Sequence, residues 1–171
     1  MALSGKEFVA KVAETIEPLL HASELQTAAY FRNQPDLDDA IFHFKRRMFN
    51  ERMNVVEIAK TLADLPASTD PVQIKLLSRQ VLDEAKHYDM VKNVIEYLSG
   101  EEFTDEELDK EFAWQMDEKN IKAKGASLFA EIGADKDELL AAVYQFVAEG
   151  RAGRVWNAMA NSIDDPVVKK T

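Results

Sequence analysis

Apolar residues recur at intervals of three and four along three long stretches of the chain, which is the spacing of one face of an α-helix. The first stripe comprises Ile41, Phe44, Met48, Glu51, Val55, Ile58, Leu62 and Leu65. The second comprises Ile74, Leu77, Val81, Glu84, Tyr88, Val91, Ile95 and Leu98. The third comprises Leu139, Ala142, Phe146, Glu149, Gly153, Trp156, Ala160 and Ile163. Each stripe predicts a helix with one face in the core of a helical bundle, and each contains a glutamate near its middle.

Proline, glycine and capping residues divide the chain into five predicted helices. Asp70 followed by Pro71 is an N-cap with proline in the first turn, and Gly100 suits a left-handed helix end. Thr104 and Glu107 have the spacing of a capping box, whereas Pro18 predicts a kink or a break in the first helix. We expect an all-α, antiparallel bundle in a single domain, residues 1–171, with helices over residues 4–32, 37–65, 71–99, 105–131 and 136–163.

The glutamates in the stripes need a partner, because an ionised carboxylate buried alone costs many kcal/mol. Glu51 and Glu84 lie equally far from the turn between their helices, so an antiparallel hairpin brings them to the same level. The same count places Glu149, and Glu118 of the fourth predicted helix, at about that level. The carboxylates are therefore expected to meet. They could be neutralised by a metal ion, or by salt bridges such as one from Arg47 to Glu51.

A histidine beside one of these glutamates favours the metal. His87 follows Glu84 by three residues, so the two side chains share a helix face and can reach one ion. Carboxylate oxygens with an imidazole nitrogen suit iron, manganese or zinc. The chain has no cysteine, so thiolate ligands, disulfides and a cysteine nucleophile are excluded.

The segment from Asp83 to His87, DEAKH, resembles the ferritin-like superfamily of di-iron carboxylate proteins. It looks closest to the oxygenase-type branch, such as the subunits of phenylacetyl-CoA epoxidase. The resemblance implies a ferritin-like bundle with its core at about residues 37–163. It also implies one or two iron ions, dioxygen and a small-molecule substrate, a reductase or other partner protein, and a homodimer, which such bundles often form. The metal ligands that it implies are Glu51, Glu84 and His87 in one half-site, and Glu118 and Glu149 in the other.

The second half-site departs from the family pattern. A histidine is expected three residues after Glu149, but Ala152 stands there. A two-metal site with five ligands, a single-metal site and a site that binds no metal all remain open. His21 could replace the missing histidine if the first helix packs into the bundle, but the pattern favours a surface histidine.

These observations predict a metal-dependent oxidoreductase or oxygenase that activates dioxygen at a carboxylate–histidine site. One alternative is a degenerate, non-catalytic relative that binds a ligand or a partner protein. Another is an iron-handling ferroxidase. The oligomeric state would help to separate these, since iron storage requires a large assembly.

The charge of the chain argues against two classes of partner. It has 31 acidic and 21 basic residues and a net charge of −10, which disfavours nucleic acid and anionic membrane surfaces. No apolar run approaches the ~20 residues that cross a bilayer. The first residues lack the layout of a signal peptide, so we expect a cytoplasmic protein.

Overall fold

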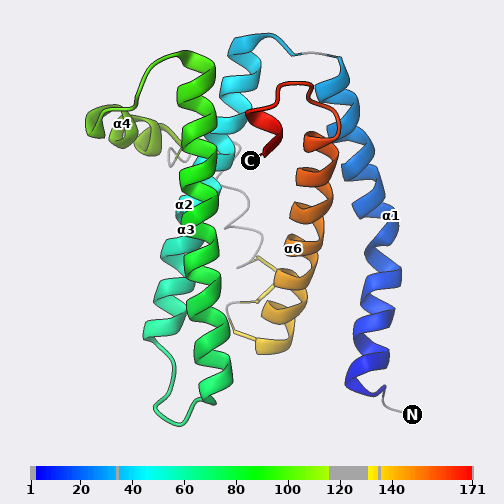
Figure 1. The fold of residues 1–171 in the computed structure, drawn as a ribbon. Coiled ribbons are helices and arrows are strands. Elements are labelled where there is room, and N and C mark those ends of the chain that lie inside the picture. The colour runs from blue at the N-terminus through cyan, green and yellow to red at the C-terminus, as the bar shows by residue number, and fades with distance from the viewer. Residues whose placement is uncertain (1–2, 34, 116–130, 135, 171) are drawn as a thin grey trace. The chain divides into compact units, whose positions relative to one another are not determined.

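The computed structural model describes residues 3–33, 35–115, 131–134 and 136–170, and every regular element in these ranges is helical. The all-α prediction is therefore confirmed for this part of the chain. None of the helices in these ranges combines the length and the apolar character that a membrane span requires. The elements are α1 (Gly5–Arg32), α2 (Leu37–Ala63), α3 (Pro71–Ser99), α4 (Asp105–Gln115), α6 (Glu138–Ala160) and a short 3₁₀ helix, η2 (Val168–Lys170) (Figure 1).

The helix ends are set by local side-chain chemistry, as the sequence predicts. Asp70 Oδ1 accepts a hydrogen bond of 2.8 Å from the Val72 amide at the start of α3. Gly100 ends α3 with a φ of 73°. At the start of α4, the Thr104 amide donates to Glu107 and the Glu107 amide donates to Thr104, which confirms the capping box. The predicted fourth helix is confirmed as far as Gln115, and its remainder lies outside the described residues.

The chain forms two compact units, which are described separately. Unit 1 comprises Met1–Pro35 and Ile121–Lys170, and unit 2 comprises Asp36–Asn120. Unit 1 contains α1, α6 and η2, and unit 2 contains α2, α3 and α4. The prediction of a single ferritin-like domain stays a prediction.

Unit 2 is built on a hairpin of α2 and α3, which run side by side from the turn at residues 64–70 (Figure 1). Both stripes predicted for this hairpin are confirmed near their centres, since each helix buries residues at the expected three- and four-residue spacing. Ile74 is the exception, since it is 40 % exposed in the first turn of α3, next to the connection from α2. The buried apolar residues are Phe44, Met48, Phe49 and Ile58 of α2, with Val91, Val94 and Ile95 of α3.

Unit 1 is held together by the packing of α1 on α6 (Figure 1). Its buried residues include Leu20 and Phe31 of α1 and Val155 and Met159 of α6. A Cβ atom added to Gly150 would stand 3.5 Å from Leu20 Cδ1, an ordinary van der Waals distance, so Gly150 of α6 lies against Leu20 of α1.

Arg154 of α6 forms ion pairs with two glutamates of α1. Its Nη2 lies 2.7 Å from Glu17 Oε1 and its Nη1 lies 3.0 Å from Glu24 Oε2. Both glutamates belong to α1, whereas the apolar stripe of α6 alone predicts a solvated arginine. Ion pairs of this partly exposed kind contribute modestly to stability, but they favour one register of the two helices over others.

The stripe predicted for α6 is wrong. Leu139 and Phe146 are 58 % and 42 % exposed, and Glu149 and Gly153 are exposed as well. The residues that α6 buries are Val155, Ala158 and Met159, so the packed face is rotated from the predicted one. The reason is that α6 carries apolar residues on several faces, and its position against α1 selects among them.

Pro18 does not break the first helix. Helix α1 is continuous from Gly5 to Arg32 and contains Pro18 in its interior. A proline removes one backbone donor and crowds the preceding turn, yet the hydrogen bonds on either side are sufficient to keep the helix whole here.

Candidate metal centre

Three of the predicted metal ligands come together in unit 2. Glu51 projects from α2, and Glu84 and His87 project from α3. One ligand atom from each lies within 4.8 Å of the other two. His87 Nδ1 is 3.4 Å from Glu51 Oε2 and 3.9 Å from Glu84 Oε2. The structure thus brings two carboxylates and one imidazole to a single point on the hairpin. We call these three residues the metal-ligand group.

The convergence follows from the geometry of the hairpin. Glu51 and Glu84 each occupy the middle of an inward-facing stripe, at equal distances along the chain from the turn. Antiparallel pairing therefore places them opposite one another. His87 lies on the same face of α3 as Glu84, because residues three apart are neighbours on a helix surface.

The two carboxylates are unusual in being buried. Glu51 is 7 % exposed and Glu84 is 5 % exposed, and they are the charged residues that the structure buries within its described ranges. The His87 side chain is 47 % exposed, so the group has one side open. Two buried carboxylates together carry a charge of about −2 when ionised, which one divalent cation balances.

The spacing of the donor atoms also fits a metal ion. Donors bound at about 2.1 Å to a four-coordinate ion lie roughly 3.4 Å from one another. The two distances from His87 Nδ1, 3.4 and 3.9 Å, are close to this value. Small rotations of the side chains would complete the fit. Three protein ligands leave at least one coordination position open for water or another ligand.

One further polar residue reaches the group. Asn54 Nδ2 donates a hydrogen bond of 3.1 Å to Glu84 Oε2. Asn54 is not among the residues predicted for the site, although its spacing is a signal: it follows Glu51 by three residues, as His87 follows Glu84.

Two residues next to the ligands on α3 have other partners. Asp83 forms an ion pair with Lys86 at 3.0 Å, and this hydrogen bond lowers the pKa of the Asp83 carboxyl. The Tyr88 ring packs near Phe112 of α4, with 6.3 Å between ring centroids, and burial raises the pKa of its phenol. The Tyr88 phenol therefore stays neutral at ordinary pH.

Among the described residues, the group does not include Glu149 or His21. Glu149 lies on α6 of unit 1 and is exposed, so the prediction that it is a buried core residue is wrong. Whether it binds metal stays a prediction. Glu118 lies outside the described residues. His21 is on α1 of unit 1, with a side chain that is 60 % exposed and 3.7 Å from Glu24, which agrees with a surface histidine.

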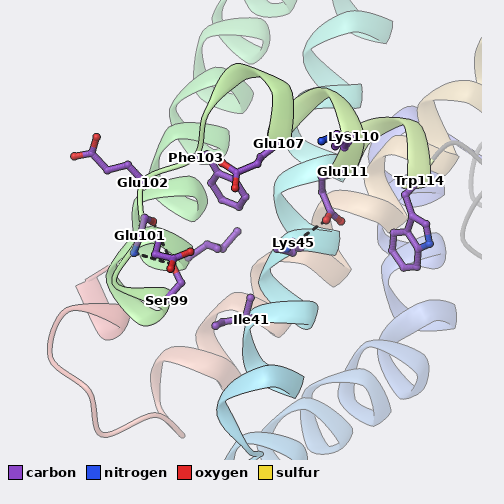
Figure 2. A pocket seen from close by; sticks show the side chains of 11 residues that line it. Ile41, Lys45, Ser99, Glu101, Glu102, Phe103, Glu107, Lys110, Glu111 and Trp114 are labelled. Carbon is purple, nitrogen blue, oxygen red and sulfur yellow. Dashed lines mark hydrogen bonds and ion pairs between the residues drawn. The ribbon is translucent and has the colours of Figure 1, made fainter.

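A pocket of about 320 Å³ lies elsewhere in unit 2, between the beginning of α2, the end of α3 and α4. Figure 2 shows Lys45 reaching from α2 toward Glu111 of α4, at 3.4 Å. Lys45 Nζ also stands 5.7 Å from the centre of the Phe103 ring. Lys45 precedes Glu51 by six residues, about 9 Å along a helix. The residues that line the pocket include none of the metal-ligand group, so the pocket is a separate feature.

Comparisons with known proteins found no matching family model, no match among the curated proteins and none among the solved structures. Membership of the ferritin-like superfamily therefore stays a prediction. The case for a function depends on the geometry of the metal-ligand group.

Proposed function

We propose that unit 2 binds a divalent transition-metal ion through Glu51, Glu84 and His87, and that the protein is a non-haem iron oxidoreductase. One observation carries the proposal: two buried carboxylates from different helices and an imidazole present ligand atoms within 4.8 Å of one another. Buried carboxylates are costly unless they are neutralised, and a cation held between them removes this cost.

The donor set favours iron or manganese, with zinc as a further candidate. Carboxylate oxygens suit hard ions, and an imidazole adds affinity for first-row transition metals. When bound, iron would supply the electrons that dioxygen accepts. Glu51 and Glu84 would balance the charge of the ion, and His87 would provide the nitrogen ligand.

The open side of the group suits access by small molecules. Because His87 is half exposed, water or dioxygen can approach the ligand atoms from its side. A small-molecule substrate and a reductase that delivers electrons are part of the proposal, as the resemblance implies. A purely structural role for the three residues is the competing explanation, with His87 hydrogen-bonded to Glu51.

Metal titration distinguishes these explanations. We expect chelator-treated protein to bind Mn²⁺, and Fe²⁺ under anaerobic conditions, with at least one ion per chain. E84Q and H87A should weaken binding by more than the roughly 10–100-fold that loss of a residue supporting a ligand produces. E57Q is the matched control, because Glu57 is an exposed glutamate of α2 that pairs with Lys60.

The outcomes separate metal binding from oxidation. A wild-type protein that binds neither ion, with stability unaffected by chelation, would refute the proposal and favour the non-catalytic alternative. If Fe²⁺ binds, admitting air should oxidise it faster in the wild type than in E84Q, as followed by absorbance. Oxidation no faster than that of free Fe²⁺ would leave a metal-binding protein without the oxidoreductase function.

The number of ions tests the second predicted half-site. Binding through unit 2 alone gives one ion per chain. Two ions in the wild type and one in E149Q would show that Glu149 contributes a ligand. Equal binding by the wild type and E149Q would exclude that role.

A further inference from the structure

The two helices of the hairpin carry the same arrangement of side chains. Helix α2 contains Glu51 and, three residues on, Asn54, whereas α3 contains Glu84 and, three residues on, His87. Each pair lies on one helix face, and the helices are antiparallel. Residue Asn54 thus occupies on α2 the position that His87 occupies on α3.

The contacts between the helices are reciprocal. His87 of α3 reaches across to Glu51 of α2, at 3.4 Å, and Asn54 of α2 reaches across to Glu84 of α3, at 3.1 Å. Each buried carboxylate is therefore approached by a nitrogen from the opposite helix. The two nitrogens differ in chemistry, since a neutral imidazole offers a lone pair to a metal and an amide NH₂ offers only donors.

We infer that Asn54 is a positioning residue, which holds the Glu84 carboxylate in the orientation in which it binds the metal ion. The inference rests on the proposed function. The amide occupies one acceptor site of Glu84 Oε2, and a carboxylate has about four such sites. Oε2 keeps a second acceptor site on the atom that lies 3.9 Å from His87 Nδ1, and within the described ranges no hydrogen bond to Oε1 competes with a metal.

The neutrality of the amide is central to this role. A lysine or arginine at position 54 would neutralise Glu84 and compete with a cation. Asn54 restrains the same carboxylate without adding charge, so the charge of the metal-ligand group is kept for the ion. Asn54 is itself an exposed residue and is not among the residues of the buried core.

The inference is tested by Mn²⁺ affinity of the full chain, measured by calorimetry after chelator treatment. We expect N54A to bind about tenfold more weakly than the wild type, the lower end of the range for loss of a residue that supports a ligand. N54L keeps about the size of the side chain but loses the donor and adds no charge, so we expect it to weaken binding as well. N93A is the control, because Asn93 is exposed on α3 and its amide faces Asp89, at 3.4 Å.

A second readout separates positioning from a structural effect. The Co²⁺-loaded protein should show altered d–d absorption in N54A, because the coordination of Glu84 changes, while N93A matches the wild type. Melting temperatures in chelator should be alike for the wild type, N54A and N93A. A lower melting temperature of N54A in chelator, with unchanged Mn²⁺ affinity and an unchanged Co²⁺ spectrum, would assign Asn54 a structural role and overturn the inference.

The remaining outcomes are also decisive. Wild-type protein without metal binding would refute the proposed function itself. Wild-type binding that N54A retains to within a factor of two would overturn the inference and leave the function standing. Weaker binding by N54A that N54L does not share would assign the effect to side-chain volume, which also overturns the positioning role.

Discussion

Single residues of unit 2 show how burial and charge oppose each other in this protein. Glu51 and Glu84 are buried at positions where apolar residues would stabilise the hairpin more. The buried carboxylates therefore lower the stability of the folded hairpin. A bound cation, together with the imidazole of His87, would offset this loss. This opposition makes the three residues a functional candidate rather than a feature of packing alone.

A partly buried histidine of α2, His43, leads to a prediction about pH. Burial, followed by the charges of Arg47 and Arg46, lowers the pKa of His43 from 6.5 to about 4. The unfolded chain then binds a proton at His43 at a higher pH than the folded protein does. The stability that His43 contributes is fully present above pH 6.5 and is lost as the pH falls toward 4.

We expect H43Q to reduce this pH dependence. Between pH 6.5 and 4.5 the wild type should lose roughly 2 kcal/mol of unfolding free energy that H43Q does not lose. Urea denaturation at a series of pH values measures the difference. H21Q, which changes an exposed histidine of α1, should behave as the wild type does. Equal slopes for the wild type and H43Q would contradict the lowered pKa.

At the scale of elements, the ends of α3 determine where the hairpin stops and α4 begins. The α3 helix begins at the Asp70 cap and ends at Gly100. The segment that follows is tied back by Glu96, which accepts a hydrogen bond of 2.9 Å from the Phe103 amide. The same carboxylate pairs with Lys92 at 2.6 Å, and this hydrogen bond lowers the pKa of Glu96. These contacts hold the connection to α4 against the end of α3.

Replacing Gly100 should weaken this helix end. With a φ of 73°, Gly100 occupies the left-handed region, where a side chain costs about 1–2 kcal/mol. We expect G100A to lower the free energy of unfolding by about 1 kcal/mol, as measured in urea.

The matched control is G153A, which should have the opposite sign. Gly153 is within α6, and an added Cβ atom would meet nothing within 4 Å. Alanine there should stabilise the protein by roughly 0.5–1 kcal/mol through helix propensity. If G100A were as stable as G153A, the left-handed conformation at Gly100 would be refuted.

At the scale of the whole molecule, metal binding and folding should be linked. The metal-ligand group needs α2 and α3 to be packed together, so an ion that binds it stabilises the folded state. At 100 times the dissociation constant, the gain is about 2.7 kcal/mol. For a chain of 171 residues we expect the melting temperature to rise by roughly 5–10 °C. Scanning calorimetry with Mn²⁺, and again with excess chelator, measures this shift.

Two comparisons check the linkage. E84Q should show little or no shift, whereas E57Q should shift as the wild type does. Hydrogen exchange then locates the effect: binding by unit 2 should slow exchange in α2 and α3 and leave α6 unchanged. Slowing around Glu149 as well would show that unit 1 contributes to the site.

In unit 2, the sequence by itself determined the helix limits, the buried helix faces and the level of the two glutamates. Asp70 and Gly100 set the limits of α3 through contacts within a few residues, and the three- and four-residue stripes of α2 and α3 define their buried faces. Short connections make these helices antiparallel, so the level of Glu51 and Glu84 follows from counting residues to the turn. All of these features depend on interactions close in sequence.

Only the tertiary structure decided the features that depend on a partner helix. The buried face of α6 is set by α1, which is more than 100 residues away in sequence, and Arg154 finds Glu17 and Glu24 there. Likewise, the hydrogen bond of 3.1 Å from Asn54 to Glu84 exists only because α2 and α3 pack against each other. A periodic pattern shows that a helix has an apolar face. When apolar residues occur on several faces, packing against a particular neighbour decides which face is buried and which polar atoms meet.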